Sequence, residues 1–426
     1  MSEPLRLGIA GLGTVAQGLL DLLARNRALI EARAGRELQV VAVASRTARD
    51  VDLLGAEFST DVLSLAGRND VDVVVELIGG EGIALDLVQQ ALDSGRPVVT
   101  ANKAILASSG QSLFGSAAAH QTRFGIEASV AGGIPIIGAI QGGLAANDIS
   151  SIAGIINGTC NYILTAMADE GTAFDDALAT AQELGYAEAD PTFDVGGIDA
   201  AHKLTILSAL SFGTPFDKGA VHIEGIEDIS LQDIRDAEAL GYVIKHLGIA
   251  RRTPQGVEAR VHPTFVPRDV LLANVNGVMN AVAVQGDATG STLYYGPGAG
   301  GEATASAVLA DIVAIARGES PTDADGSVRE SRWVPITDVV SAAYLRIPVV
   351  DEAGVFAKIA TILSEHGISI EGVIQQERAI EDRKVPISVV TQPVLEADML
   401  RAVAALAELP DVVGPVRRIR VEHLGG

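Results

Sequence analysis

The 426-residue sequence contains a single cysteine, Cys160. One cysteine excludes an internal disulfide framework and a cysteine-built metal site, and it is typical of a protein in a reducing compartment. Positive charge is also scarce, because 31 Lys and Arg residues stand against 54 Asp and Glu residues and the net charge is -23. A chain this acidic is repelled by phosphate backbones, so we expect no nucleic-acid partner and no anionic membrane surface.

Long apolar runs are scarce as well, and only residues 129–146 approach the length of a membrane-spanning helix. This run contains six glycine and proline residues together with Gln141, so a buried loop and helix is the better interpretation. The first residues enter a predicted strand without the charged and apolar regions of a signal peptide. We therefore expect a cytoplasmic protein with two or three domains, for whose cores 48% hydrophobic residues are ample.

The N-terminal part has the pattern of a dinucleotide-binding fold. Residues 5–10 form an apolar run without alternation, which predicts a strand buried on both faces of a parallel sheet. Gly11 and Gly13 follow, and then an amphipathic helix begins. In this context Gly11 permits a tight turn, and Gly13 lets a pyrophosphate approach the helix N-terminus. The next predicted strand, 39–44, is followed by Arg46, which favours the 2′-phosphate of NADP over NAD; a solvated arginine is the alternative.

Further strands predicted at 70–78 and 97–100 alternate with a helix at 84–94. This order indicates a Rossmann-type, doubly wound parallel sheet. Thr100 ends the last of these strands, and Lys103 lies just past its carboxyl end, where open α/β sheets bind their ligands. The alternative for Lys103 is a lysine that covers a helix end.

Glu127 lies on a further predicted strand, 124–128, before a tight turn at 132–135. A carboxylate beside inward-facing carbonyl groups has the composition of a hard-cation site. From the residues alone, a glutamate that caps backbone N–H groups is the simpler explanation.

A second, α+β part begins near residue 150. Its pattern predicts helices at 174–184, 200–210 and 231–247, followed by β-rich sequence at 257–265 and 280–286. A glycine-rich stretch ending at Gly301 then precedes a small-residue helix at 303–317. Glycines at the head of a helix suggest close approach to an anionic ligand, which would return the chain to the cofactor; tight helix packing is the competing explanation.

The stretch 185–203 concentrates ionisable groups between few apolar residues. Its carboxylates are Glu188, Asp190, Asp194 and Asp199, and Lys203 follows Asp199 by one helical turn. Such a loop and helix could hold the ammonium of an amino-acid substrate and place a proton donor beside its reacting carbon. The alternative is a helix cap with a surface ion pair, which is common on solvated helices.

The C-terminal part follows a polar linker at 318–327. Its periodicity predicts strand, helix, two strands, helix and strand, which is a ferredoxin-like βαββαβ unit. The predicted elements are 344–350, 355–365, 368–375, 385–391, 396–409 and 416–421.

Five motifs in order make the chain resemble homoserine dehydrogenase of the long bacterial type. They are Gly-Leu-Gly-Thr-Val at 11–15, Thr-Ala-Asn-Lys at 100–103, Glu-Ala-Ser-Val-Ala-Gly-Gly-Ile-Pro at 127–135, Asn-Gly-Thr-Cys-Asn-Tyr-Ile-Leu at 157–164, and the stretch 185–203. The tail resembles an ACT regulatory domain. The resemblance implies a Rossmann domain at 1–145 with 298–318 returning to it, a catalytic and dimerisation domain at 146–297, a linker at 319–342 and an ACT domain at 343–426.

The resemblance also implies an activity: reversible reduction of L-aspartate 4-semialdehyde to L-homoserine with NADPH or NADH. By position, Lys203 resembles the catalytic lysine and Lys103 the second active-site lysine. The implied substrate carboxylates are Glu188, Asp194 and Asp199. The implied cofactor contacts are Gly11, Gly13, Thr14, Val15, Arg46, Thr100, Lys103, Gly185 and Gly300, and the implied monovalent-cation loop, for Na⁺, has Glu127, Val130, Gly132 and Ile134.

Threonine inhibition and a homodimeric or homotetrameric assembly are further implications of the resemblance. The sequence departs from the family pattern at three places: Cys160 replaces a threonine, Ala16 replaces the third glycine, and the segment before Gly354 lacks a proline. Two alternatives remain open. One is an aspartate-semialdehyde dehydrogenase with Cys160 as its thiol nucleophile, and the other is a cofactor-binding amino-acid sensor without turnover.

Overall fold

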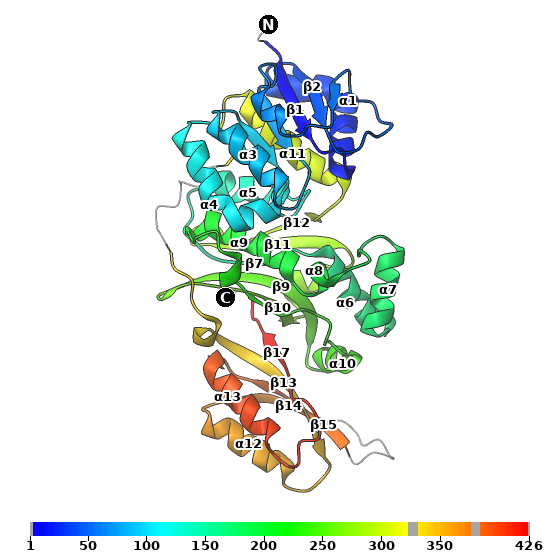
Figure 1. Cartoon of the computed structure of the whole chain (residues 1–426). Coiled ribbons are helices and arrows are strands. Elements are labelled where there is room, and N and C mark those ends of the chain that lie inside the picture. Colours follow the sequence, from blue (N-terminus) through cyan, green and yellow to red (C-terminus); the bar gives the residue numbers. More distant parts are fainter. Residues whose placement is uncertain (1–2, 323–330, 376–383, 425–426) are drawn as a thin grey trace.

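The computed structural model describes residues 3–322, 331–375 and 384–424. Figure 1 shows three parts along one axis, with the N-terminal sheet at one end, a larger sheet with its helices in the middle, and a smaller α+β unit at the other end. Part of the predicted linker, 323–330, lies outside the described residues. Across the ranges that the structure describes, no helix has both the length and the apolarity that a membrane span requires.

The N-terminal part is a parallel six-stranded sheet in the order β3-β2-β1-β4-β5-β6. Its central strands are buried on both faces, as their continuous apolar sequence predicts. The order reverses between β1 and β4, which is the point where doubly wound sheets bind ligands. The strands are β1 Leu5–Ala10, β2 Leu38–Ala44, β3 Glu57–Ser59, β4 Val73–Glu76, β5 Val98–Thr100 and β6 Phe124–Gly125, and the helices are α1 Thr14–Ala34, α2 Ser64–Gly67, α3 Ile83–Asp93 and α4 Lys103–Ala119.

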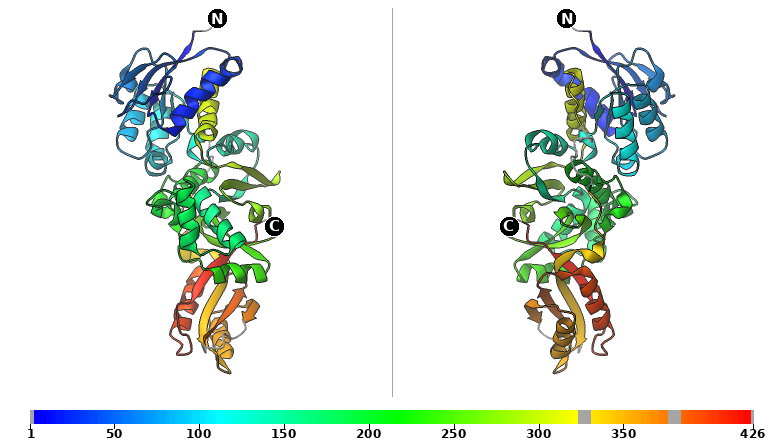
Figure 2. Two further views of the ribbon diagram at one scale, coloured as in Figure 1. Left: turned by 90° about the vertical axis from the view of Figure 1, so that its right-hand side faces the viewer. Right: turned by 90° about the vertical axis from the view of Figure 1, so that its left-hand side faces the viewer.

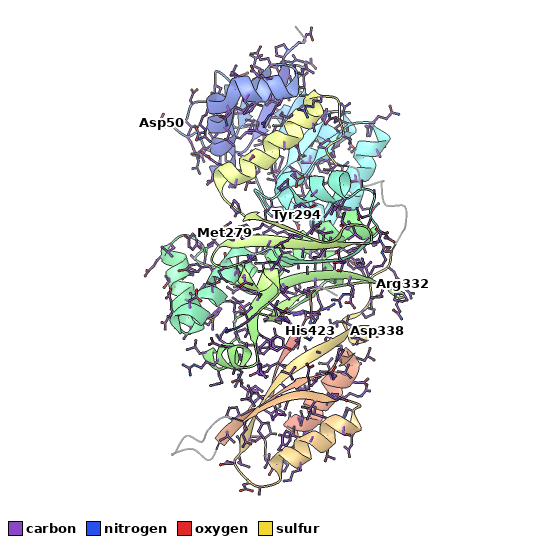
Figure 3. The ribbon with its side chains drawn as sticks, turned by 180° about the vertical axis from the view of Figure 1, so that it is seen from behind. Asp50, Met279, Tyr294, Arg332, Asp338 and His423 are labelled. Atoms are coloured by element: carbon purple, nitrogen blue, oxygen red, sulfur yellow. The ribbon has the colours of Figure 1, made fainter. Side chains whose placement is uncertain are left out.

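A helix from far along the chain, α11 Gly301–Ala316, completes this part. Figure 3 shows it from behind, lying across the N-terminal sheet, and Figure 2 shows it beside α1. The two helices meet through glycine: a Cβ on Gly18 would lie 2.8 Å from the carbonyl carbon of Gly301. Close helix packing, one of the two explanations that the sequence offered, therefore holds at the start of α11. Approach to a cofactor by this segment stays a prediction.

The central part is built on a second, mixed sheet of 11 strands. Its path runs β12-β11-β7-β9-β10-β17-β13-β15-β14, and helices α6, α9 and α10 pack against the part formed by β7 to β11. The strands of this region are β7 Ile149–Ile155, β8 His222–Ile223, β9 Tyr242–Thr253, β10 Gly256–Pro267, β11 Met279–Gly286 and β12 Gly290–Pro297. The helices are α6 Gly158–Glu170, α7 Phe174–Glu183, α8 Thr192–Val195, α9 Ile198–Phe212 and α10 Leu231–Ala239.

Three secondary-structure predictions for these regions were wrong. The helix predicted at 231–247 ends at Ala239, because Gly241 adopts a left-handed conformation (φ 84°) and the chain then pairs with β10 as strand β9. Strand β12 was not predicted; it is only partly buried and lacks a continuous apolar run. The strand predicted at 124–128 stops at Gly125 and is followed by a short 3₁₀ turn, η1 Glu127–Ser129.

The C-terminal unit has the predicted βαββαβ order. Its sheet runs β17-β13-β15-β14 with antiparallel neighbours, and Figure 1 shows both helices on one face. This is the ferredoxin-like arrangement. The elements are β13 Val340–Val350, α12 Val355–Glu365, β14 Ile370–Gln375, β15 Lys384–Thr391, β16 Val394–Leu395, α13 Glu396–Ala407 and β17 Arg417–Val421.

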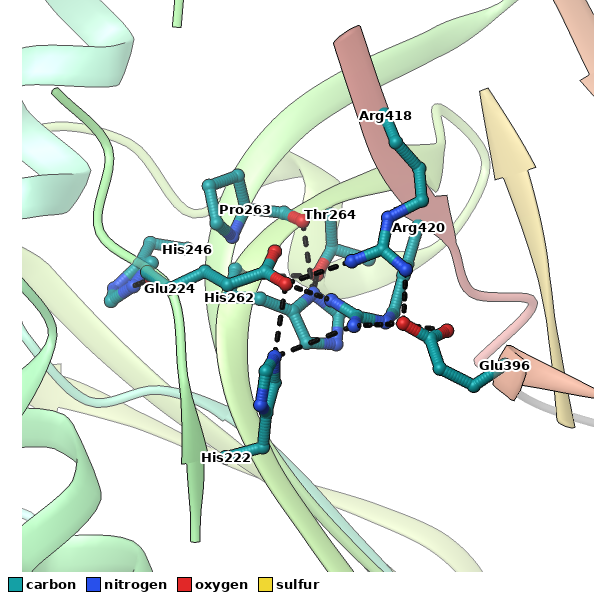
Figure 4. A network of polar contacts seen from close by, with 9 residues as sticks. All are labelled: His222, Glu224, His246, His262, Pro263, Thr264, Glu396, Arg418 and Arg420. Carbon is teal, nitrogen blue, oxygen red and sulfur yellow. Dashed lines mark hydrogen bonds and ion pairs between the residues drawn. The ribbon is translucent and has the colours of Figure 1, made fainter. Parts of the chain in front are cut away.

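The last strand joins the C-terminal unit to the central sheet. Strand β17 pairs with β13 on one side and, through Arg420 and Val421, in parallel with β10 on the other. A polar network crosses this junction (Figure 4): Glu224 lies 2.9 Å from Arg418 Nη2 and 3.0 Å from Arg420 Nη1, and Glu396 accepts hydrogen bonds from both arginines. The C-terminal unit and the central part therefore share one continuous β-sheet.

Candidate active site

The glycine turn after β1 is shaped for close approach by a ligand. Gly11 has φ 98°, and a Cβ there would lie 2.6 Å from the carbonyl oxygen of Leu77, so glycine is required. Gly13 is the N-cap of α1, and the space where its Cβ would be is open within 4 Å. Thr14 and Val15 then open the helix with N–H groups that have no intrahelical partner. These residues fit the pyrophosphate of a dinucleotide.

A second helix start lies beside this turn. Gly300 (φ 117°) is the N-cap of α11, and a Cβ on Gly301 would lie 2.9 Å from the carbonyl oxygen of Thr14. The positive ends of α1 and α11 are therefore neighbours, which favours an anionic group between them. Arg46 is exposed two residues after the end of β2, where an adenosine ribose would lie in this fold.

A buried hydrogen-bond network shapes the carboxyl ends of β4 and β5. Glu76 is fully buried; its Oε1 accepts the N–H groups of Ile78 (2.7 Å) and Gly79 (3.1 Å), and its Oε2 accepts the Thr100 hydroxyl at 2.5 Å. The same hydroxyl accepts the N–H of Asn102. The Thr100 hydroxyl is thus engaged inside the protein, and sequence analysis had not identified Glu76 as its partner.

Asn102 connects this network to the first active-site lysine. Its side chain caps α4 by accepting the N–H of Ala104 (3.1 Å) and donates to the carbonyl of Gly80 (2.6 Å). Lys103 follows as the first residue of α4. The lysine is therefore held at the sheet edge where the sequence predicts a ligand.

Asp199 brings two lysines together from distant parts of the chain. Its Oδ1 lies 3.0 Å from Nζ of Lys103, and its Oδ2 lies 2.8 Å from Nζ of Lys203. Asp199 is buried, with a relative accessibility of 4%. Burial alone would raise the pKa of its carboxyl, but the charges of Lys203 and Lys103 outweigh that effect and lower the pKa. Asp199 is therefore a fixed negative charge between two ammonium groups.

Lys203 is held by two acceptors. Besides Asp199, its Nζ donates to the carbonyl oxygen of Ile156 at 2.7 Å. A lysine ammonium has three hydrogens, so one remains for a substrate oxygen. Lys103 keeps more solvent contact (side chain 32% exposed), and its Nζ lies 5.6 Å from the ring centroid of Phe193.

Asp194 lies beside Asp199 and shares a partner with it. The side-chain amide of Asn157 donates to Oδ1 of Asp194 at 2.8 Å and to Oδ2 of Asp199 at 2.9 Å. Burial raises the pKa of Asp194, and the Asn157 hydrogen bond opposes that rise. Sequence analysis missed the role of Asn157, because a single asparagine after a strand has no periodic signal.

The chain matches known proteins over its whole length. Family models match at residues 11–127 (homoserine dehydrogenase, NAD binding domain), 135–313 (homoserine dehydrogenase) and 343–408 (ACT domain). A homoserine dehydrogenase of Pseudomonas aeruginosa is 50% identical, with 99% of this chain and 100% of the relative covered. The chain belongs to the homoserine dehydrogenase family. It is an oxidoreductase whose N-terminal part binds a nicotinamide dinucleotide.

Solved structures of the family share this architecture over all or part of the chain. The crystal structure of a homoserine dehydrogenase from Thiobacillus denitrificans has a TM-score of 0.94 and 47% identity, with 99% of each chain covered. A hyperthermophilic archaeal homoserine dehydrogenase in complex with NADPH has a TM-score of 0.62 and 27% identity, and covers 73% of this chain and 97% of its own. The expected Rossmann, catalytic and ACT arrangement is thereby confirmed.

Glu188 and Gly185, also expected in a homoserine dehydrogenase site, are exposed in the segment between α7 and α8. Gly185 adopts a left-handed conformation (φ 75°) just after α7. The carbonyl oxygen of Glu188 accepts the side-chain amide of Gln182. The structure thus assembles Lys103, Asp194, Asp199 and Lys203 and leaves Glu188 outside this cluster.

The carboxylate of Glu127 is buried and caps a short helix, α5 Ile136–Gly138. Its oxygens accept the N–H groups of Ile137 (2.9 Å) and Gly138 (2.6 Å). Burial raises its pKa. This is the capping role that the residues alone suggested. Among the described residues, no cluster of three or more His, Cys, Asp or Glu side chains is placed to hold a metal ion.

Cys160 is buried, and desolvation together with the nearby Asp194 and Asp199 charges raises the pKa of its thiol. Its Sγ donates to the carbonyl oxygen of Asp194 at 3.2 Å. A thiol held protonated is a poor nucleophile, because the thiolate is the reactive form. The thiol-dependent alternative is therefore not favoured, and neither is a sensor without turnover, since the lysine and carboxylate cluster is intact.

Proposed function

We propose that the chain reduces L-aspartate 4-semialdehyde to L-homoserine reversibly, with NADPH as the preferred cofactor. The observation that carries the proposal is the convergence of Lys103 and Lys203 on Asp199, with Lys103 at the sheet edge that also carries the glycine turn. This arrangement provides a positioned proton donor next to the place where a nicotinamide would lie.

A reduced nicotinamide, when bound, would supply a hydride to the aldehyde carbon in the forward direction. Negative charge then develops on the aldehyde oxygen, and Lys203 stabilises it and donates a proton from its unengaged N–H. In the reverse direction the oxidation of homoserine by NADP⁺ releases a proton, so this direction improves as pH rises, and Lys203 is placed to accept the proton. Lys103 contacts the other carboxylate oxygen of Asp199, Oδ1, at the sheet edge where we place the cofactor.

The substrate's ammonium needs carboxylates, and we assign Asp194 and Asp199, together with the exposed Glu188, to this role. Asp199 carries fixed negative charge, and Asp194 lies within reach of the same amide. Glu188 would join them when substrate occupies the site.

The cofactor assignment rests on named positions in the N-terminal part. Gly11, Gly13, Thr14, Val15 and Gly300 would surround the pyrophosphate, and Arg46 would bind a 2′-phosphate. The further contacts would be made by Thr100, Lys103 and Gly185. Arg46→Asp should lower kcat/KM for NADP⁺ and raise the relative use of NAD⁺. If the ratio of the kcat/KM values for the two cofactors is unchanged, residues other than Arg46 determine the cofactor preference.

We also propose a monovalent cation, Na⁺, held by Glu127 and the carbonyl groups of Val130, Gly132 and Ile134. Positive φ values at Ala131 (55°) and Gly132 (48°) turn the backbone sharply there, and each Glu127 oxygen has a lone pair beyond its N–H bond. Activity measured in sodium, potassium and tetramethylammonium buffers of equal ionic strength tests this. Equal rates in all three would count against the site.

For the C-terminal unit we propose threonine as the amino-acid ligand and inhibitor. The shared strand β17 connects ligand binding in this unit directly to the central sheet.

We propose a homodimer or homotetramer as the assembly, because Leu271 (69% exposed) and Tyr295 (58%) are large apolar side chains left in solvent. Sedimentation measurements would test the assembly.

The first experiment is reduction of NADP⁺ and NAD⁺ by L-homoserine at alkaline pH, with and without L-threonine. Turnover that threonine suppresses supports both the activity and the regulation. Turnover that threonine leaves unchanged supports the activity alone. Folded protein without turnover on either cofactor overturns the proposal.

A further inference from the structure

Asn157 lies at the buried junction where β7 ends and α6 begins. It is the N-cap of α6, and its Oδ1 accepts the N–H of Cys160 at 2.8 Å. Its relative accessibility is 4%. The preceding residue, Ile156, offers its carbonyl oxygen to Lys203. Two successive residues of this junction therefore reach into the lysine and carboxylate cluster.

Both donor hydrogens of the Asn157 side-chain amide are used. Its Nδ2 has two hydrogens, one for Asp194 and one for Asp199, and its oxygen takes the N–H of Cys160. Reversing the amide would place its oxygen against two carboxylates and its NH₂ group against an N–H donor. Only one orientation of the amide is compatible with these partners.

We propose that Asn157 is a positioning residue of the reaction: its amide holds Asp199 between the two lysines and keeps Asp194 beside it. The inference rests on the function proposed above. Two buried carboxylates repel each other, and a donor shared between them offsets that repulsion. Because Oδ2 of Asp199 accepts both Asn157 and Lys203, the amide fixes the carboxylate in the orientation that also serves Lys103.

A helix cap alone would not need asparagine here. Aspartate is as good an N-cap as asparagine, since either side-chain oxygen can accept the N–H. Aspartate cannot donate to Asp194 or Asp199 while it is ionised, and it adds a third negative charge. The substitution Asn157→Asp therefore keeps the helix cap and removes the two hydrogen bonds that position the carboxylates. Among the described residues, the charged and titratable groups that face this region are Lys103 on α4, Cys160 on α6, Asp194 on α8, Asp199, His202 and Lys203 on α9, Glu227 in the segment before α10, and His246 on β9.

The experiment compares the wild type with Asn157→Asp and Asn157→Ser as full-length enzymes. The kcat and KM values for L-aspartate 4-semialdehyde and NADPH are measured from pH 5.5 to 8.5, with the thermal midpoint of each protein. We expect a kcat loss of about 100-fold for Asn157→Asp near neutral pH, with the KM for NADPH unchanged. The deficit should shrink as pH falls, because the introduced carboxyl regains a donor once it is protonated. Asn157→Ser keeps a cap but cannot bridge two carboxylates, so we expect about a tenfold loss without that pH dependence.

The matched control is Asn147→Asp. Asn147 also accepts backbone N–H groups, from Ala288 and Thr289, but it lies just before β7, against the turn between β11 and β12 and outside the site. It should keep wild-type kcat at every pH. Wild-type kcat in Asn157→Asp would overturn the positioning role, as would a loss that does not change with pH. If the aspartate variant does not fold, wild-type kcat in Asn157→Ser overturns it instead. An inactive wild type would overturn the proposed function itself, which these variant ratios do not test.

Discussion

Lys203 Nζ lies 2.8 Å from Oδ2 of Asp199, one helical turn earlier on α9. The sequence left open an exposed ion pair with Asp199 as a helix cap. The structure excludes that interpretation, because the two side chains are 12% and 6% exposed and Gly197 is the N-cap. A buried lysine ammonium that is held by a buried carboxylate has a defined position relative to a substrate. An exposed ion pair is mobile and would not position the ammonium in this way.

Replacing this lysine should separate catalysis from cofactor binding. We expect Lys203→Ala to lower kcat by about 100-fold to 10,000-fold, because the proton donor is removed. The affinity for NADPH, followed by its fluorescence, should stay within about twofold, since the partners of Lys203 are Asp199 and the carbonyl group of Ile156 rather than residues of the glycine turn. Lys358→Ala is the control: Lys358 also forms an ion pair, with Asp411, but on the distant unit. Loss of NADPH binding together with turnover would contradict the assigned role.

The contact between α1 and α11 should depend on two glycines. A Cβ on Gly18 would meet the backbone of Gly301 at 2.8 Å, and a backbone cannot move aside as a flexible side chain can. We expect Gly18→Ala to cost about 1–3 kcal/mol in the free energy of unfolding and to raise the KM for NADPH. The measurements are urea unfolding and steady-state kinetics.

Gly115→Ala is the matched control for that prediction. Gly115 is an exposed glycine inside α4, and its Cβ would meet nothing within 4 Å. Alanine there should be neutral or stabilise the protein by about 0.5–1 kcal/mol. Equal stabilisation by both substitutions would show that the two helices tolerate a wider separation than the structure has.

Most of the fold could be predicted because its strands are either fully buried or clearly bounded. The continuous apolar runs of β1 and β4 are typical of a doubly wound sheet, and the C-terminal alternation is typical of βαββαβ. The boundary between α10 and β9 was missed because the apolar residues around 240 fit both periods. The pairing of this segment with β10 makes it a strand, and Gly241 permits the turn between α10 and β9.

The active site was predictable in part. Lys103, Asp199 and Lys203 came from motifs and a family resemblance, and the structure brings them together. Glu76 and Asn157 could not be identified, because their roles depend on partners 24 or more residues away in sequence. The spacing of neighbouring residues in the sequence does not indicate such a contact.

Cys160 should be unreactive in the folded enzyme. Burial raises the pKa of its thiol, so the thiolate is scarce at neutral pH. We expect iodoacetamide at pH 7.5 to leave turnover unchanged and to label Cys160 only after unfolding, as followed by mass spectrometry. Rapid labelling with parallel loss of turnover would instead revive a thiol role.

The junction network should make stability depend on acid in a defined direction. Burial would raise the pKa of Glu224, but the hydrogen bond with His222 and the charges of Arg420 and Arg418 lower it overall. A carboxyl with a lowered folded pKa stabilises the fold fully above its unfolded pKa of about 4.3, and this contribution is lost progressively as pH falls from there through the folded pKa. Glu224→Gln should therefore cost about 2 kcal/mol in urea unfolding at pH 7 and at pH 5.5, and less at pH 3.

An exposed glutamate gives the comparison that this last prediction needs. Glu238 pairs with Arg268 while its side chain is 68% exposed, so Glu238→Gln should change the free energy of unfolding little at any of these pH values. A Glu224→Gln cost that persists undiminished at pH 3 would show that the glutamate acts through packing rather than charge. A cost that shrinks with acid would instead show that the ionised carboxylate holds β17, and with it the C-terminal unit, to the central sheet.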